Sequence, residues 1–80
     1  MTAKKDKLFK NYIPVVSDMA VIIKAKRMKL KLTQAYVAKK SYISVSALEK
    51  IEQGVGGISV RTLCALSAVL DINPIRLLEC

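Results

Sequence analysis

The chain has 80 residues, a hydrophobic content of 52% and a formal net charge of +8. This suits one small domain with a compact core, and the charge favours an anionic partner such as nucleic acid or an acidic membrane surface, with simple solvation as the alternative. The chain has no histidine and only two cysteines, Cys64 and Cys80, which excludes a zinc site or a Cys–His nucleophile built from a single chain.

Residues 1–16 are expected to form a basic N-terminal arm, and residues 17–80 the folded domain. Four lysines lie in the first ten positions, while Pro14 favours an extended course for residues 12–16. The arm either contacts nucleic acid, binds a protein partner or only keeps the chain in solution. No apolar run is long enough for a signal peptide or a membrane span, so we expect a cytoplasmic protein with free thiols.

From Ser17 onward the sequence predicts five short helices. Ser17 is the expected N-cap of the first helix, which carries an apolar stripe to about residue 30. The third helix ends at Gly54, and Asn73 followed by Pro74 starts the fifth. The second, third and fourth helices are expected to begin after hydroxyl caps at Thr33, Ser44 and Ser59.

The helices at residues 33–40 and 44–53 are joined by a turn of about three residues, which is helix-turn-helix spacing. We expect four apolar residues to face the core, Val37 and Ala38 of the helix at 33–40 and Leu48 and Ile51 of the helix at 44–53. Many helical bundles contain such corners, so the spacing alone does not establish a DNA-binding pair. The five short helices and their connections of a few residues predict an all-α domain.

Three stretches carry a more specific signal: IKAKRMKLKLTQAYVAKK at residues 23–40, IEQG at 51–54 and ALSAVLDINPIRLL at 65–78. They resemble the Cro/cI-type (XRE) helix-turn-helix family, in particular lambdoid phage repressors and restriction-modification controller proteins. The most specific elements are the Thr-Gln pair at 33–34 with Ala38, and the Ile-Glu-x-Gly ending at 51–54. The resemblance implies a five-helix, lambda-repressor-like domain that binds double-stranded DNA.

The resemblance also implies which residues contact DNA. The helix at residues 44–53 corresponds to the one that enters the major groove, and the helix opened by Thr33 and Gln34 to the one that crosses the phosphate backbone, where Gln34 would hold a phosphate. For each single residue a solvated surface position is the alternative. The residues expected to contact base edges, or to lie beside them, are Val45, Ser46, Glu49, Lys50 and Gln53. Those expected to contact phosphates are Lys39, Lys40, Ser44 and Arg61.

Two further pairs of residues receive roles from the resemblance. Arg27 and Glu52 match an ion pair that ties the first and third helices together, which keeps Arg27 off the list of DNA contacts. Ile75 and Leu78 are candidates for a homodimer interface on the last helix, and the alternative is that both lie in the core.

Tyr42 departs from the family pattern, because many relatives have glycine with positive φ at this turn position. We therefore predict a left-handed or altered turn with the tyrosine ring pointing outward, close enough to the DNA backbone to touch a phosphate. The loop after Gly54 also departs from the pattern. Its glycines replace Lys or Arg of relatives, and the amides of Gly56 and Gly57 would then take the place of charged contacts.

The leading functional hypothesis is a sequence-specific transcriptional regulator, expected to be a repressor, that binds a palindromic operator as a homodimer. The alternatives are an antitoxin of a toxin-antitoxin module and a restriction-modification controller protein with autoregulatory DNA binding. An enzyme is the weakest class, because the chain lacks histidine, paired carboxylates and a metal-ligand cluster. No cofactor, metal or membrane partner is expected.

Overall fold

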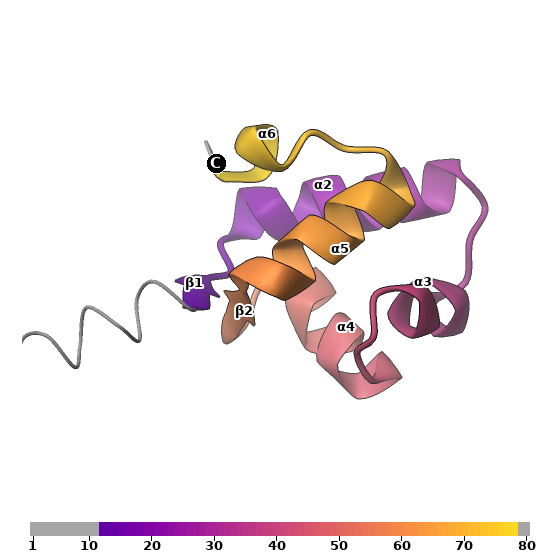
Figure 1. The fold of residues 1–80 in the computed structure, drawn as a ribbon, viewed down its shortest axis with the longest axis horizontal. Helices are drawn as coiled ribbons and strands as arrows, with labels where there is room; N and C mark the ends of the chain where they lie inside the picture. Colours follow the sequence, from indigo (N-terminus) through magenta and orange to yellow (C-terminus); the bar gives the residue numbers. More distant parts are fainter. Residues whose placement is uncertain (1–11, 79–80) are drawn as a thin grey trace, which may run out of the picture.

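The computed structural model describes residues 12–78, which form five helices and one small sheet. In chain order these are β1 (Tyr12–Pro14), α2 (Ser17–Lys29), α3 (Gln34–Lys40), α4 (Val45–Gln53), β2 (Gly57–Ser59), α5 (Val60–Leu70) and α6 (Pro74–Leu78). Helix α5 crosses the middle of the molecule, with α6 above it and with α3 and α4 below it (Figure 1). The expected five-helix, all-α architecture is confirmed, with the sheet as an addition.

Local capping accounts for most of the helix starts. The side chains of Thr33, Ser44 and Ser59 each accept a hydrogen bond from the amide three residues later, at 3.1, 3.0 and 3.1 Å. Asn73 Oδ1 accepts from the amide of Ile75 at 3.0 Å, ahead of the helix that begins at Pro74. These four predicted caps are confirmed, since each depends only on residues within one turn of the helix start.

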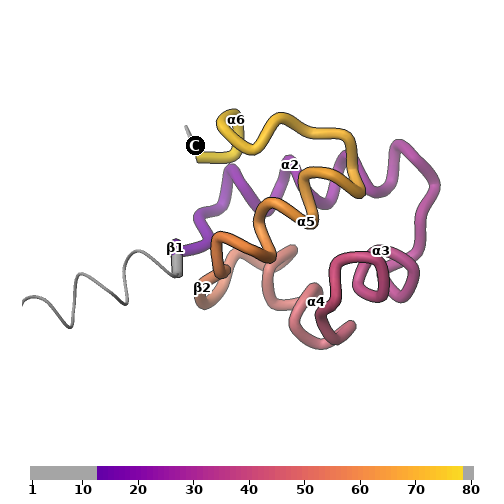
Figure 2. The backbone as a smooth tube through the Cα atoms, in the orientation of Figure 1, coloured from indigo at the N-terminus to yellow at the C-terminus, as the bar shows by residue number. Residues whose placement is uncertain are grey.

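A two-stranded antiparallel sheet, which the sequence did not predict, joins the two segments that precede α2 and α5. Strand β1 pairs with β2 in the register Tyr12↔Ser59, Ile13↔Ile58 and Pro14↔Gly57. Figure 2 shows how these segments, far apart in the sequence, meet at one end of the molecule. Val15 is 6% exposed and Ile58 is 2% exposed. Residues 12–16, which the sequence grouped with the arm, therefore include part of the folded domain.

The predicted cap of the first helix is wrong. Val16 occupies the N-cap position in extended backbone and makes no side-chain cap hydrogen bond, while Ser17 is the first helical residue. The amide of Val15 donates to Gly56 O at 3.0 Å. The chain therefore enters α2 directly from the strand pairing, and this tertiary contact sets the start of the helix.

All five helices contribute to one apolar core. Val37, Ala38, Leu48 and Ile51 are buried as predicted. No helix within residues 12–78 is long and apolar enough to cross a membrane. The buried helical residues of the core are Met19, Ala20, Ile23, Val37, Ala38, Leu48, Ile51, Leu63, Leu66, Leu70 and Leu77.

Candidate nucleic-acid interface

Helices α3 and α4 form a packed pair whose second member presents a polar outer face. Leu48 and Ile51 turn inward from α4, while its N-cap Ser44 is exposed at the entrance of the helix. The remaining sequence-predicted residues of α4 lie together on the exposed face: Val45, Ser46, Glu49, Lys50 and Gln53. The structure therefore brings the predicted base-contacting residues onto one surface. Their roles in DNA binding stay predictions.

The turn between α3 and α4 has the left-handed geometry that the sequence predicted at Tyr42. Its φ angle is 60° and the residue is 92% exposed. The amide of Ile43 donates to Ala38 O at 3.0 Å, and the amide of Tyr42 donates to Lys39 O at 3.2 Å. This pair of bonds is a Schellman motif, in which one left-handed residue satisfies the last free carbonyls of a helix. The angle between α3 and α4 is thus set by a type of helix ending whose left-handed residue is usually glycine.

The same motif ends the helices α2, α4 and α5. The left-handed residues are Lys31, Gly54 and Asp71, with φ angles of 59°, 77° and 56°. Aspartate accepts this conformation more readily than a bulky side chain, and glycine accepts it without steric cost. Lys31 and Tyr42 therefore bear the larger steric cost among the four endings, and of these two Tyr42 lies in the turn before α4. The exposed Tyr42 ring makes too little packing contact to offset this strain.

A hydrogen-bonded network fixes the other end of α3. Arg27 Nε donates to Glu52 Oε2 at 2.7 Å and Arg27 Nη2 donates to Glu52 Oε1 at 3.1 Å. Arg27 Nη1 also donates to Leu32 O at 2.9 Å. The two charged side chains are only 12% and 3% exposed. The ion pair that the resemblance implied is thus present and connects α2, the segment before α3, and α4.

Gln34 belongs to the same network, which the sequence did not predict. Its Nε2 donates to Glu52 Oε1 at 3.0 Å. A primary amide has two N–H donors and a carbonyl acceptor, so one N–H remains for another partner. The buried carboxylate therefore orients the glutamine beside the open first turn of α3, where amides are available to an anion.

The basic residues near this pair differ in their surroundings. Lys40 Nζ lies 5.6 Å from the centroid of the Tyr36 ring, in a cation–π contact. Lys39 and Arg61 are exposed. Arg61 follows the Ser59 cap of α5, where the Ser59 hydroxyl accepts from the Thr62 amide and donates to Thr62 Oγ1 at 2.9 Å. Arg61 therefore stands on a rigid first turn.

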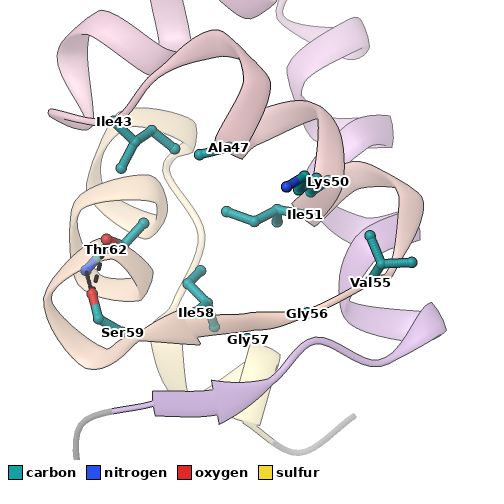
Figure 3. A pocket seen from close by; sticks show the side chains of 10 residues that line it. All are labelled: Ile43, Ala47, Lys50, Ile51, Val55, Gly56, Gly57, Ile58, Ser59 and Thr62. Atoms are coloured by element: carbon teal, nitrogen blue, oxygen red, sulfur yellow. Dashed lines mark hydrogen bonds between the residues drawn. The ribbon is translucent and has the colours of Figure 1, made fainter.

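A hollow of about 300 Å³ separates α4 from strand β2. Figure 3 shows apolar side chains of α4 and its preceding turn facing Ile58 across it, with Ser59 and Thr62 at one side. Lys50 is its one charged lining residue. Within residues 12–78, no group of His, Cys, Asp and Glu side chains could hold a metal ion. The polar side chains that line the hollow, Lys50, Ser59 and Thr62, can offer hydrogen bonds and one positive charge.

Comparison with known proteins identifies the arrangement. The profile of the helix-turn-helix family matches residues 23–77, which is more than half of the chain. The chain belongs to the Cro/cI-type (XRE) helix-turn-helix family. The family consists of DNA-binding transcription regulators, so the predicted fold and general function are confirmed.

Several solved structures have the same fold. The restriction-modification controller protein C.AhdI from Aeromonas hydrophila is 24% identical over 76% of this chain and 92% of that one, with a TM-score of 0.71. SinR, a master regulator for biofilm formation solved in complex with DNA, is 30% identical over 75% and 97%, with a TM-score of 0.69. The N-terminal DNA binding domain of SinR from Bacillus subtilis gives 30% identity over 75% and 88%, and the same TM-score. No curated protein sequence matches the chain.

Proposed function

We propose that this helix-turn-helix regulator binds a palindromic operator as a homodimer, with α4 in the major groove, and represses transcription there. The observation that carries the proposal is the exposed polar face of α4, held at a fixed angle by the Tyr42 turn at one end and by the Glu52 network at the other. Such a preorganised helix fits the major groove, whose base edges neutral side chains can distinguish. The SinR complex with DNA supports this use of the fold.

Within this proposal each exposed residue of α4 has a chemical role. Lys50 donates to guanine O6 or N7, Ser46 donates or accepts, and Val45 packs on a thymine methyl group. Glu49 accepts from cytosine N4 or repels phosphate in wrong registers. Gln34 holds a backbone phosphate through its remaining N–H, which the bond to Glu52 keeps in position.

The last helix is the proposed dimer contact. Ile75 and Leu78 are 60% and 52% exposed, whereas Leu77 between them is fully buried. The alternative that Ile75 and Leu78 lie in the core is therefore wrong, and both are available to a second copy. Changing both to lysine should give a monomer by sedimentation without loss of helicity, while the matched change Val21→Lys, at an apolar residue on α2 that is 64% exposed, should leave the dimer intact.

The arm at residues 1–11 lies outside the described residues, so its role stays a proposal. If it follows the duplex, each phosphate that it neutralises adds about 0.9 to the slope of log affinity against log salt concentration. Deletion of residues 1–11 should therefore lower the slope. An unchanged slope would leave the arm without DNA contacts. It would also leave open the antitoxin alternative, in which residues 1–16 bind a protein.

Selection of bound fragments from random double-stranded DNA, followed by footprinting, tests the proposed function. We expect an enriched inverted repeat with half-sites about one helical turn apart, roughly 10 base pairs. An enriched single half-site would contradict the dimer. The absence of any enriched motif, together with a featureless footprint, would contradict sequence-specific binding.

A further inference from the structure

A second hollow lies between the α3–α4 turn and the first half of α5. Its volume is about 510 Å³, and it is lined by Ser41, Tyr42, Arg61, Thr62 and Ala65. Helix α3 packs directly against α5, and this packing holds the turn after α3 beside the first half of α5. The hollow opens beside the entrance of α4, two residues before the Ser44 cap.

Ser41 contributes a polar group that the fold leaves unsatisfied. The residue is 2% exposed, and its Oγ has no hydrogen-bond partner among the residues that the structure describes. The backbone amide of Ser41, by contrast, donates to Val37 O at 2.9 Å. Buried hydroxyls are nearly always paired in folded proteins, so an unpaired one in the wall of a hollow indicates a missing partner.

Tyr42 and Arg61 face the same hollow and also lack partners. Tyr42 is in strained left-handed backbone, and its phenol is free of hydrogen bonds among the described residues. Arg61 is exposed and, within residues 12–78, makes no ion pair or hydrogen bond. A strained residue, an unpaired hydroxyl and an unpaired cation therefore converge on one place. Strain and unpaired polar groups are tolerated where a ligand uses them.

We propose that this hollow seats one phosphate group of the DNA backbone. Arg61 supplies the positive charge and a forked donor, the Tyr42 phenol donates a second hydrogen bond, and the Ser41 hydroxyl in the wall is the third donor. This inference rests on the proposed function and deepens it. A phosphate held there fixes the position of the DNA backbone relative to Val45 and Ser46. Tyr42, at a position where many relatives have glycine, thereby becomes a backbone contact.

Methylphosphonate substitution in a DNA fragment selected by the unaltered protein tests the seat directly. Replacing each phosphate in turn by the uncharged group should reveal one position per half-site at which wild-type affinity falls by about tenfold. Arg61→Gln should be insensitive to substitution at that position, whereas Lys24→Gln, which removes the same charge from exposed α2, should keep the wild-type response. Equal sensitivity of Arg61→Gln and wild type at every position would overturn the proposal.

Ser41→Ala provides a second test with opposite signs in two measurements. Removal of an unpaired buried hydroxyl should raise the Tm of the free protein, while loss of the donor should weaken DNA binding several-fold. A lower Tm, or an unchanged affinity, would overturn the role of Ser41. These results differ from a failure of the proposed function, in which the wild-type protein itself would bind no selected fragment.

Discussion

The two ends of α3 satisfy their polar groups in opposite ways. At the start, Gln34 and Arg27 both donate to one buried carboxylate, and Thr33 caps the helix. At the end, Ser41 Oγ has no hydrogen-bond partner within residues 12–78, and Tyr42 is strained. The buried charged groups at the start of α3 are therefore paired in the free protein, while one N–H of Gln34 remains for a ligand. The end contains costs that a ligand can relieve, so stability and DNA binding should respond differently to substitutions at the two ends.

The largest effect should come from the paired end. Arg27→Met leaves Glu52 buried without its cation and should lower the free energy of unfolding by about 3 kcal/mol. Adding Glu52→Leu to the same chain should recover most of that loss, because the burial of an unpaired charge is then removed. Urea denaturation measures both changes. A double variant as unstable as Arg27→Met would show that the loss comes from packing and not from the charge.

Lys24→Met is the matched control for that cycle. Lys24 lies on the same helix but is exposed, and an exposed substitution away from special features should change stability by less than about 0.5 kcal/mol.

A smaller effect is expected at Gln34. Gln34→Ala removes one hydrogen bond to the Glu52 carboxylate and should cost about 1 kcal/mol of stability. DNA affinity should fall as well, even at temperatures where the variant is fully folded, because the phosphate donor is lost. Fluorescence anisotropy with a selected fragment would measure the affinity. An unchanged affinity would restrict Gln34 to its structural bond.

The smallest expected effect has the opposite sign. Tyr42→Gly relieves the left-handed backbone of a bulky residue, partly offset by the entropy of glycine in the unfolded chain, and should stabilise the protein by about 0.5–1 kcal/mol. Asp71→Gly should stabilise it less, because aspartate tolerates this conformation. Thermal unfolding measures both. Only the Tyr42 variant should bind DNA more weakly, and equal affinities for the two variants would remove the functional difference between these helix endings.

Features governed by neighbouring residues could be predicted from the sequence. Thr33 and Ser44 cap their helices through amides within one turn. The left-handed turn at Tyr42 has local backbone bonds, but it was inferred from the family pattern, in which many relatives have glycine at this position. The Arg27–Glu52 pair was inferred from the family resemblance. Its physical basis is two charged positions on helices that the fold brings together.

Features that depend on tertiary contacts could not be predicted. The pairing of Ile13 with Ile58 joins two three-residue strands that are too short to show alternation. The Gln34–Glu52 bond joins residues on two different helices, which only the packing of α3 against α4 brings together. The burial of the Ser41 hydroxyl without a partner among the described residues arises only when α3 is packed against α5.

The central claim is that the outer face of α4 contacts base edges, and Lys50 offers its most direct test. Selection from random DNA should be run in parallel with wild type, Lys50→Gln and the exposed control Lys24→Gln. Because lysine favours guanine and glutamine favours adenine, Lys50→Gln should shift the preferred base at one symmetry-related position of each half-site, while Lys24→Gln should keep the wild-type motif. An identical motif for wild type and Lys50→Gln would contradict base contact by Lys50 from this face of α4.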